Sequence, residues 1–249
     1  MDNGSSQYNA ERQTAVQLAH LAGYTGYGVN VVIMDDFETD SDSPHWDGTH
    51  GKYIGHIIDE IAPDSPQWHI DIYNTSYNIS NFNLEDKDIV NLSSSIDWTL
   101  DGSLTIEESA ELLETIGNKH IGLYTNSHNP LWVVAAGNDN QSCNYLLDCN
   151  GYTYLLDTYG EEFISVGALT ENGETLTDYS AHAGNLDFHR NNFLVTTVHD
   201  ETQPGTSYAA PIVTGAAALI MDKFGMKDCL LYTSPSPRDR TRSRMPSSA

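Results

Sequence analysis

The chain has very few basic residues. Eleven lysines and arginines stand against 35 aspartates and glutamates among 249 residues, which gives a formal net charge of −24. A surface with this excess of negative charge repels nucleic acid and anionic membranes, so we expect neither as a partner. Two interpretations of the acids stay open: a solvated acidic surface, or carboxylates that bind cations. We favour the first, because a count of acids does not by itself build a metal site.

The sequence also lacks long apolar runs and an N-terminal segment that resembles a secretory signal. No stretch approaches the ~18 consecutive apolar residues that suggest a membrane span. The start, Met1-Asp2-Asn3-Gly4, has neither the basic nor the apolar segment of a secretory signal. With a hydrophobic fraction of 39% and a mean hydropathy of −0.41, the chain is long enough for one sizeable domain and does not require two.

Cysteine is scarce, with three in the chain. Cys143 and Cys149 flank the short segment Asn-Tyr-Leu-Leu-Asp. A short-range disulfide between them fits this spacing and would indicate an oxidising compartment, while two buried free thiols are the alternative. The third cysteine, Cys229, belongs to a C-terminal segment that we treat separately below.

Apolar spacing predicts helices over residues 9–22, 51–61, 106–116 and 207–224, and strands over 29–34, 68–73, 88–93, 131–136, 163–169 and 193–198. Strands that alternate with helices predict an α/β fold of three layers, in which a largely parallel central sheet has helices on both faces. Functional sites of such sheets form beyond the carboxyl ends of the strands. Asp35 and Asn138 follow two of the predicted strands at such ends.

Ser207 stands in Gly-Thr-Ser-Tyr-Ala-Ala-Pro, at the start of the last predicted helix. A serine is a poor nucleophile unless a base takes its proton, but a helix N-terminus offers backbone N–H groups to a developing oxyanion. An ordinary N-cap serine is the alternative. None of the ten histidines follows Ser207, and no Gly-x-Ser-x-Gly segment is present. Both facts exclude the Ser…Asp…His order of α/β-hydrolases.

Three further segments stand before this serine, and their order along the chain carries information about the family. They are Val-Val-Ile-Met before Asp35, His50-Gly51 followed by Ile-Gly-His-Ile-Ile, and Val-Val-Ala-Ala-Gly before Asn138. Together with the serine helix they resemble the subtilase family of serine endopeptidases, over residues 24–222. The resemblance implies a subtilisin-like fold, a triad of Asp35, His50 and Ser207, and an oxyanion site made by the Asn138 amide.

Some positions depart from the family pattern and leave alternatives. Asp36-Phe37 stand where the family has serine or threonine and then glycine, and Lys52 stands where it has threonine. Asp36 is the alternative acid, because strand ends predicted from sequence slip by a residue or two. His45 is the alternative base, although no glycine follows it.

The resemblance extends to the substrate. Asn-Leu-Ser-Ser-Ser, ending at Ser95, is similar to the family strand that pairs with an extended peptide, so Ser93, Ser94 and Ser95, with Ala136 and Gly137, are expected to bind substrate. Such pairing recognises backbone and predicts broad specificity. A peptide or protein substrate, a monomer, and an extracellular or periplasmic location follow as expectations, with a cytoplasmic location as the alternative.

No cofactor is required by this chemistry, and we expect no metal in the catalytic site. Five acids crowd the loop between the acid and the base: Asp36, Glu38, Asp40, Asp42 and Asp47. Their alternation is similar to a calcium loop, but Ser41 stands where that loop needs glycine. A structural calcium ion therefore stays an open alternative. The spacing of His45, His50 and His56 matches no known zinc pattern.

The segment from Cys229 to Ala249 resembles a translated sequencing-library adapter, and its four arginines break with the acidic chain before it. A basic tail of the protein is the alternative. We expect a peptidase domain over residues 1–228, incomplete at its C-terminus, and a non-native tail over 229–249. Two other functions compete with peptidase activity: a catalytically inactive peptide-binding protein of the same fold, and an acidic calcium-binding module.

Overall fold

The computed structural model describes residues 5–37, 49–71, 84, 86–93, 130–143, 150, 152–153, 156–157, 162–185, 187–198 and 204–225. The predicted helix over residues 106–116 lies outside these ranges. Within them the elements are α1 (Ser5–Leu21), β1 (Val31–Asp35), α2 (His50–Ile61), β2 (Gln67–Asp71), β3 (Ile89–Leu92), β4 (Leu131–Ala135), β5 (Phe163–Leu169), α5 (Asp187–Asn191), β6 (Phe193–Thr197), a 3-10 turn η2 (Thr206–Tyr208) and α6 (Ala210–Phe224).

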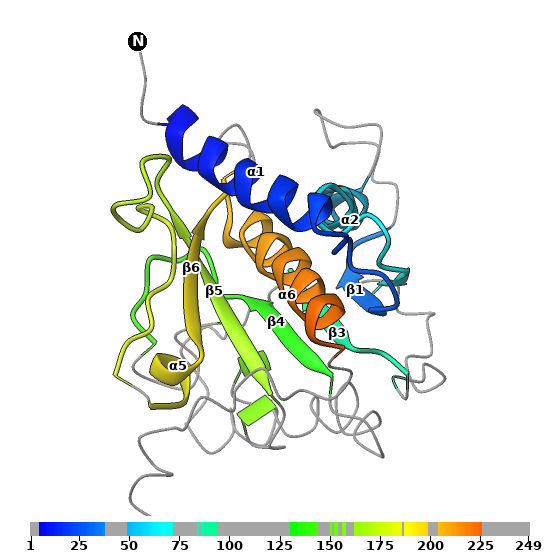
Figure 1. Cartoon of the computed structure of the whole chain (residues 1–249). Coiled ribbons are helices and arrows are strands. Elements are labelled where there is room, and N and C mark those ends of the chain that lie inside the picture. The colour runs from blue at the N-terminus through cyan, green and yellow to red at the C-terminus, as the bar shows by residue number, and fades with distance from the viewer. Residues whose placement is uncertain are drawn as a thin grey trace, which may run out of the picture.

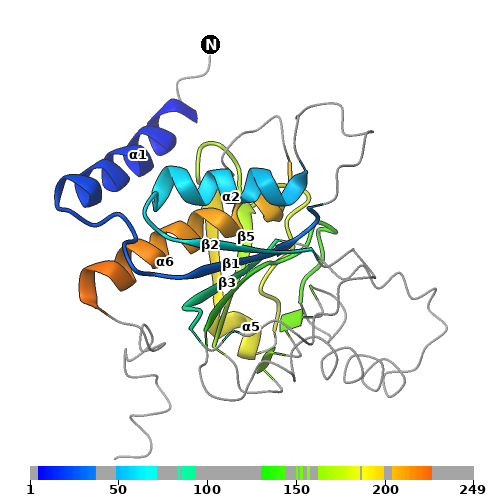
Figure 2. The same ribbon diagram turned by 90° about the vertical axis from the view of Figure 1, so that its right-hand side faces the viewer.

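The six strands form one sheet in the order β2-β1-β3-β4-β5-β6, and each neighbouring pair is parallel. Figure 1 shows α6 crossing in front of this sheet, with α1 in front of α6. Turned by 90°, α2 and α6 lie on one side of the sheet and α5 on the other (Figure 2). The predicted α/β architecture with helices on both faces is confirmed.

The core lies between the sheet and the helices α2 and α6. Val31 and Ile33 of β1 and Val133 of β4 belong to the same buried cluster as Ile54 and Ile58 of α2. Side chains alternate between the two faces of a strand, so Asp35 shares a face with Val31 and Ile33. That face carries α2. The period of the strand therefore directs the Asp35 carboxylate toward the helix that begins with His50.

Helices α2 and α6 approach each other closely at one glycine. A Cβ added at Gly215 would lie 2.7 Å from Cβ of Ile61, a distance that real side chains do not tolerate without a shift. The absence of a side chain at Gly215 thus sets the spacing of the two helices. This spacing matters for the site, because α2 carries His50 and the turn before α6 carries Ser207.

Element boundaries differ from the sequence predictions in ways that have local causes. Helix α1 begins earlier than residue 9 and ends at Leu21; Gly23, just beyond it, has a positive φ of 89°. The prediction that the last helix starts at Ser207 is wrong. Pro211 has no N–H to donate to the Ser207 carbonyl, so the chain forms a 3-10 turn at Ser207 and the α-helix begins at Ala210.

No helix among the described residues is both long and apolar enough to cross a membrane.

Candidate active site

The imidazole of His50 and the carboxylate of Asp35 form a short hydrogen bond. His50 Nδ1 lies 2.6 Å from Asp35 Oδ1. Asp35 ends β1, and His50 is the first residue of α2. The chain between them is tied down as well, because the Gly51 N–H donates to the Asp36 carbonyl at 2.8 Å. Two residues 15 positions apart thus meet at the carboxyl end of a central strand, where α/β sheets build their sites.

Burial and charge set the protonation of this pair. Asp35 is 1% exposed, whereas the His50 side chain is 31% exposed, and the Asp36 N–H also donates to Asp35 Oδ1 at 2.7 Å. Burial works to lower the pKa of His50, but the hydrogen bond to Asp35 and the charges of Asp35 and Asp36 outweigh it. The pKa of His50 therefore lies above its usual value of 6.5.

Ser207 lies in η2, next in sequence to a residue that contacts His50. The ring of its neighbour Tyr208 lies 5.3 Å from the His50 imidazole, measured between centroids. Among the described residues no hydrogen bond joins Ser207 to His50, and the Ser207 N–H donates to none of them. Catalytic hydrogen bonds of unliganded enzymes are often long and tighten when substrate binds. Ser207 thus presents a hydroxyl and a backbone donor for which the described residues supply no partner.

Asn138 is held beside the same turn by Thr206. Its Oδ1 accepts from the Thr206 N–H at 2.8 Å and from the Thr206 hydroxyl at 3.0 Å. Two donors require an oxygen at that position, so the amide orientation follows from the hydrogen bonds. The Asn138 NH₂ is then directed away from Thr206 and stays available as a donor. Asn138 is an exposed residue, so a substrate can reach that donor.

The residues predicted to bind substrate fall into three groups. Ser94 and Ser95 lie outside the described residues. Ser93 is 1% exposed, and its hydroxyl accepts from the Asn91 amide at 2.8 Å, so its side chain belongs to the interior. The backbone N–H and C=O groups of Ala136 and Gly137 all take part in hydrogen bonds within the fold. Because these backbone groups are already used, Ala136 and Gly137 are better placed to line a site than to form hydrogen bonds with the backbone of a substrate.

The alternative residues find little support in the described part of the chain. His45 and most of the acidic loop lie outside it. His56 is on the exposed side of α2, where its Nε2 lies 3.4 Å from Glu60 Oε1. No group of three or more histidine, cysteine, aspartate or glutamate side chains in the described ranges is arranged to hold a metal ion. Cys143 is disulfide-bonded, and its partner lies outside the described residues.

Sequence reasoning missed three residues of this site. Thr206 orients the Asn138 amide, and the rings of Tyr53 and Tyr208 pack against each other beside His50, with centroids 5.4 Å apart. The hydroxyl of Thr206, adjacent to the predicted nucleophile, was a usable signal. The two tyrosines gave no signal, because their proximity depends on how α2 packs against η2.

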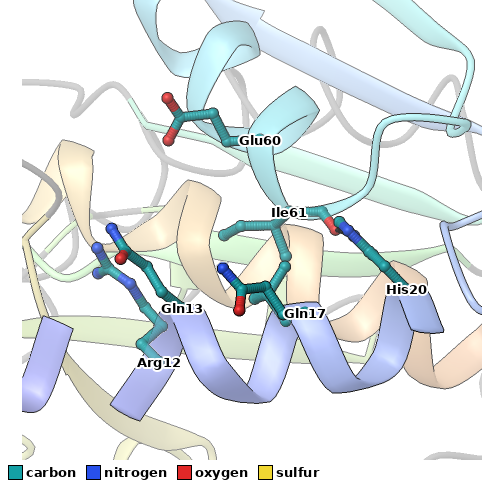
Figure 3. Close-up of a pocket in the computed structure, with 7 residues that line it drawn as sticks. Arg12, Gln13, Gln17, His20, Glu60 and Ile61 are labelled. Carbon is teal, nitrogen blue, oxygen red and sulfur yellow. Dashed lines mark hydrogen bonds between the residues drawn. The ribbon is translucent and has the colours of Figure 1, made fainter. Parts of the chain in front are cut away.

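A separate cavity of about 180 Å³ lies between α1 and α2. Figure 3 shows Arg12, Gln13, Gln17 and His20 of α1 on one side of it, and Glu60 and Ile61 of α2 on the other. His20 Nε2 donates to the Ile61 carbonyl at 2.8 Å and ties the two helices together. The cavity adjoins the last turn of α2, whereas His50 is in the first, roughly 16 Å away along the helix axis. It is therefore not part of the candidate site.

Comparison with a solved structure agrees with this fold. The structure is similar to that of MycP1 with its N-terminal propeptide removed, at a TM-score of 0.50 and 17% identity, covering 88% of this chain and 85% of that one. A lanthipeptide protease matches at a TM-score of 0.46 and 16% identity, over 88% and 80% of the two chains. A protease from Pseudoalteromonas arctica matches at 0.44 and 16%, over 82% and 80%.

Sequence comparisons add the family. A search of curated protein sequences finds no significant match. The model of the subtilase family, a family of peptidases, matches residues 40–238, which is most of the chain and reaches into the C-terminal segment that we set apart above. The match begins after Asp35, so that residue is supported by its contact with His50 alone. By this match the chain belongs to the subtilase family.

Proposed function

We propose that this protein is a serine endopeptidase that cleaves peptide bonds through Asp35, His50 and Ser207. The observation that carries the proposal is the 2.6 Å hydrogen bond between Asp35 and His50 Nδ1. His50 begins the helix that contacts η2, the turn that carries Ser207. Membership of a peptidase family supports peptides or proteins as the substrate class.

Each residue has a role that its position supports. Because Asp35 accepts from Nδ1, the neutral His50 carries its proton there, and Nε2 is left as the base that takes the Ser207 proton. The Ser207 oxygen then forms a bond to the peptide carbonyl carbon. The negative charge that develops on the carbonyl oxygen needs donors, and the Asn138 NH₂ and the Ser207 N–H are the two that stand beside this turn.

The second half of the reaction uses the same groups in reverse. Protonated His50 gives its proton to the leaving amine, which breaks the peptide C–N bond and leaves an acyl ester on Ser207. Water then attacks this ester while His50 accepts a proton from it, the bond between the acyl carbon and the Ser207 oxygen breaks, and His50 returns the proton to that oxygen as the peptide acid is released. Asp35 keeps its charge throughout and stabilises the imidazolium that forms in each half.

A fluorophosphonate probe tests the proposal directly, because it forms a covalent bond only with an activated serine. We expect labelling at Ser207 and hydrolysis of an unstructured protein such as casein. Ser207→Ala should abolish labelling and reduce kcat by about 10⁶, the loss that the corresponding substitution causes in subtilisin. Ser142→Ala, at an exposed serine, is the matched control and should change neither.

Two outcomes would redirect the proposal. Normal hydrolysis by Ser207→Ala would show that another group is the nucleophile. Peptide binding without labelling or hydrolysis by the unaltered protein would favour the inactive peptide-binding alternative. The probe and a calorimetric peptide titration on the same preparation separate the two.

A further inference from the structure

Aromatic side chains from three elements surround the first turn of α2. Phe37 comes from the loop after β1, Tyr53 from α2, and Tyr208 from η2. All three pack against the buried core from partly or fully buried positions. The turn that they surround carries His50, which the previous section assigns as the general base.

Tyr208 contacts the imidazole itself. Its ring centroid lies 5.3 Å from that of His50, with the planes tilted by 58°. The same ring meets Tyr53 edge-on, at 5.4 Å and 67°. Tyr208 is therefore packed against two rings, and it cannot swing away from His50 without losing packing against Tyr53.

Phe37 fixes the backbone under the histidine. A Cβ at Gly51 would lie only 2.6 Å from Cζ of Phe37, so the ring occupies the space that a side chain at Gly51 would need. On its other side Phe37 stacks on His69 of β2, with centroids 4.5 Å apart and planes 13° from parallel. The start of α2 is thereby fixed against the edge of the sheet.

A single hydrogen bond leaves an imidazole some freedom. The bond from His50 Nδ1 to Asp35 fixes one ring nitrogen, but the ring is still able to tilt about that contact, and terminal torsions of histidine are intrinsically broad. The general base must present Nε2 to the serine within a few tenths of an ångström, since misplacement of about 1 Å costs on the order of 10²-fold in rate. A second contact on the ring face would remove this freedom.

We propose that Tyr208, backed by Tyr53, is a positioning residue that holds the His50 imidazole in the orientation that directs Nε2 toward Ser207. The proposal rests on the function proposed above. It predicts that the planar ring of Tyr208 is needed for full kcat and that its hydroxyl is not. Burial, Tyr53 and Asp35 raise the pKa of Tyr208 to about 12, so the phenol stays neutral over the working range and supplies no charge.

Substitutions at Tyr208 separate ring from hydroxyl. Tyr208→Phe keeps the ring and should retain most of the kcat. Tyr208→Leu removes the ring and should lower kcat about tenfold with little change in KM, because positioning of the base acts after substrate has bound. Tyr27→Leu is the matched control, at a tyrosine that is 77% exposed, and should leave both constants unchanged. A change confined to KM in Tyr208→Leu would overturn the proposal and make Tyr208 a substrate contact.

A readout that does not depend on activity keeps this test distinct from the proposed function. In the Ser207→Ala background, the imidazole signals of His50 can be followed by NMR against pH. Loss of the Tyr208 ring admits water to a histidine that faces Asp35, Asp36, Tyr53 and Tyr208, which reduces the burial that lowers its pKa. The midpoint should therefore move to higher pH and the ring signals should broaden. An unchanged His50 titration and line width in Tyr208→Leu would overturn the proposal, whatever is found for Ser207.

If Tyr208→Leu fails to fold, Tyr53→Leu provides the second test. It leaves the direct contact between Tyr208 and His50 but removes the ring that backs it, so a smaller loss of kcat and a smaller shift in the same direction are expected. No change in either quantity in a folded Tyr53→Leu protein would contradict the proposed support.

Discussion

Two adjacent acids at the end of β1 differ in what they contact, and this difference predicts different mutant phenotypes. Asp35 holds His50 Nδ1, whereas Asp36 provides a backbone carbonyl to Gly51, a contact that a side-chain substitution leaves in place. Asp35→Asn should lower kcat by ~10⁴, because the amide stabilises the wrong imidazole tautomer, as in related triads. Asp36→Asn should cost far less. Steady-state kinetics on both variants test the assignment, and the reverse order would identify Asp36 as the orienting acid.

The Asn138 amide is expected to contribute only in the transition state. Its Oδ1 is engaged by Thr206, so its NH₂ is the group left for the oxyanion. Asn138→Ala should reduce kcat by ~10²–10³ with KM nearly constant, the range known for removal of one oxyanion donor in subtilisin. Asn140→Ala, two residues further along the same loop, serves as the control. An increase in KM with an unchanged kcat would show that Asn138 binds the substrate and does not stabilise the oxyanion.

The protonation of His50 predicts how the rate of the reaction depends on pH. Only the neutral imidazole accepts the serine proton, and the charges of Asp35 and Asp36 hold the pKa of His50 above 6.5 despite its burial. The rate should therefore fall as pH decreases, with an acid-side midpoint of kcat/KM above pH 6.5. Asp36→Asn removes one of the raising charges and should move that midpoint to lower pH. A profile that is flat between about pH 5 and 8 would argue against a histidine base.

At the scale of elements, the close contact between α2 and α6 predicts a specific cost. A Cβ at Gly215 would lie 2.7 Å from Ile61 Cβ, and overpacking of this kind typically costs 1–3 kcal/mol. Gly215→Ala should lower the free energy of unfolding by about that amount in a urea titration, although alanine is the better helix former. Ala216→Ser, one residue along on the exposed face of α6, should have little effect. If Gly215→Ala were stabilising, the two helices would have room to move apart.

The elements were predictable from sequence wherever a local pattern determines them. Val31 to Met34 form an apolar run that is typical of a buried strand, and Ile54, Ile57, Ile58 and Ile61 repeat at helical spacing. The predicted strand stops one residue before Asp35 and the predicted helix begins one residue after His50, so these two patterns locate both elements to within a residue at the site. Their mutual distance does not, because it depends on the parallel sheet and on the face that α2 covers.

Local sequence patterns do not predict the surroundings of each side chain in the fold. The sequence predicts Ser93 as a substrate contact through its backbone, which stays a prediction. Its hydroxyl, just after β3, accepts from the Asn91 amide, whose oxygen in turn accepts from Thr214 of α6 at 2.8 Å, and no local pattern indicates this buried network. The contact of Tyr208 with His50 joins residues 158 positions apart and has no periodic signal in the sequence. The start of the last helix was misplaced because Pro211 acts on the carbonyl four residues before it.

At the scale of the whole molecule, a buried histidine that is not part of the candidate site links the stability of the fold to pH. His189 of α5 is 1% exposed, and its Nε2 lies 3.3 Å from the Thr153 hydroxyl. That hydroxyl already donates to the Asn150 carbonyl at 2.8 Å, so it accepts from Nε2, and this contact fixes which ring nitrogen carries the proton of the neutral imidazole. Burial lowers the pKa of His189 from 6.5 to about 4.

The direction of the resulting stability change follows from linkage. Between pH 6.5 and about 4 the unfolded chain binds a proton at His189 that the folded chain does not, so acid favours unfolding over this interval and the effect saturates below it. A difference of this size corresponds to roughly 3 kcal/mol. His189→Gln should therefore lose less unfolding free energy than the unaltered protein between pH 7.5 and 4, by an amount approaching that figure.

Urea titrations across this pH interval measure the difference, and the slope against pH matters more than the absolute stability, which the substitution will also change. Arg190→Gln is the control, because it alters the next residue of α5, which is exposed, and leaves the buried imidazole in place. Equal pH slopes for His189→Gln and the unaltered protein would show that His189 is protonated in the folded state, and that the interior around Thr153 admits a charge.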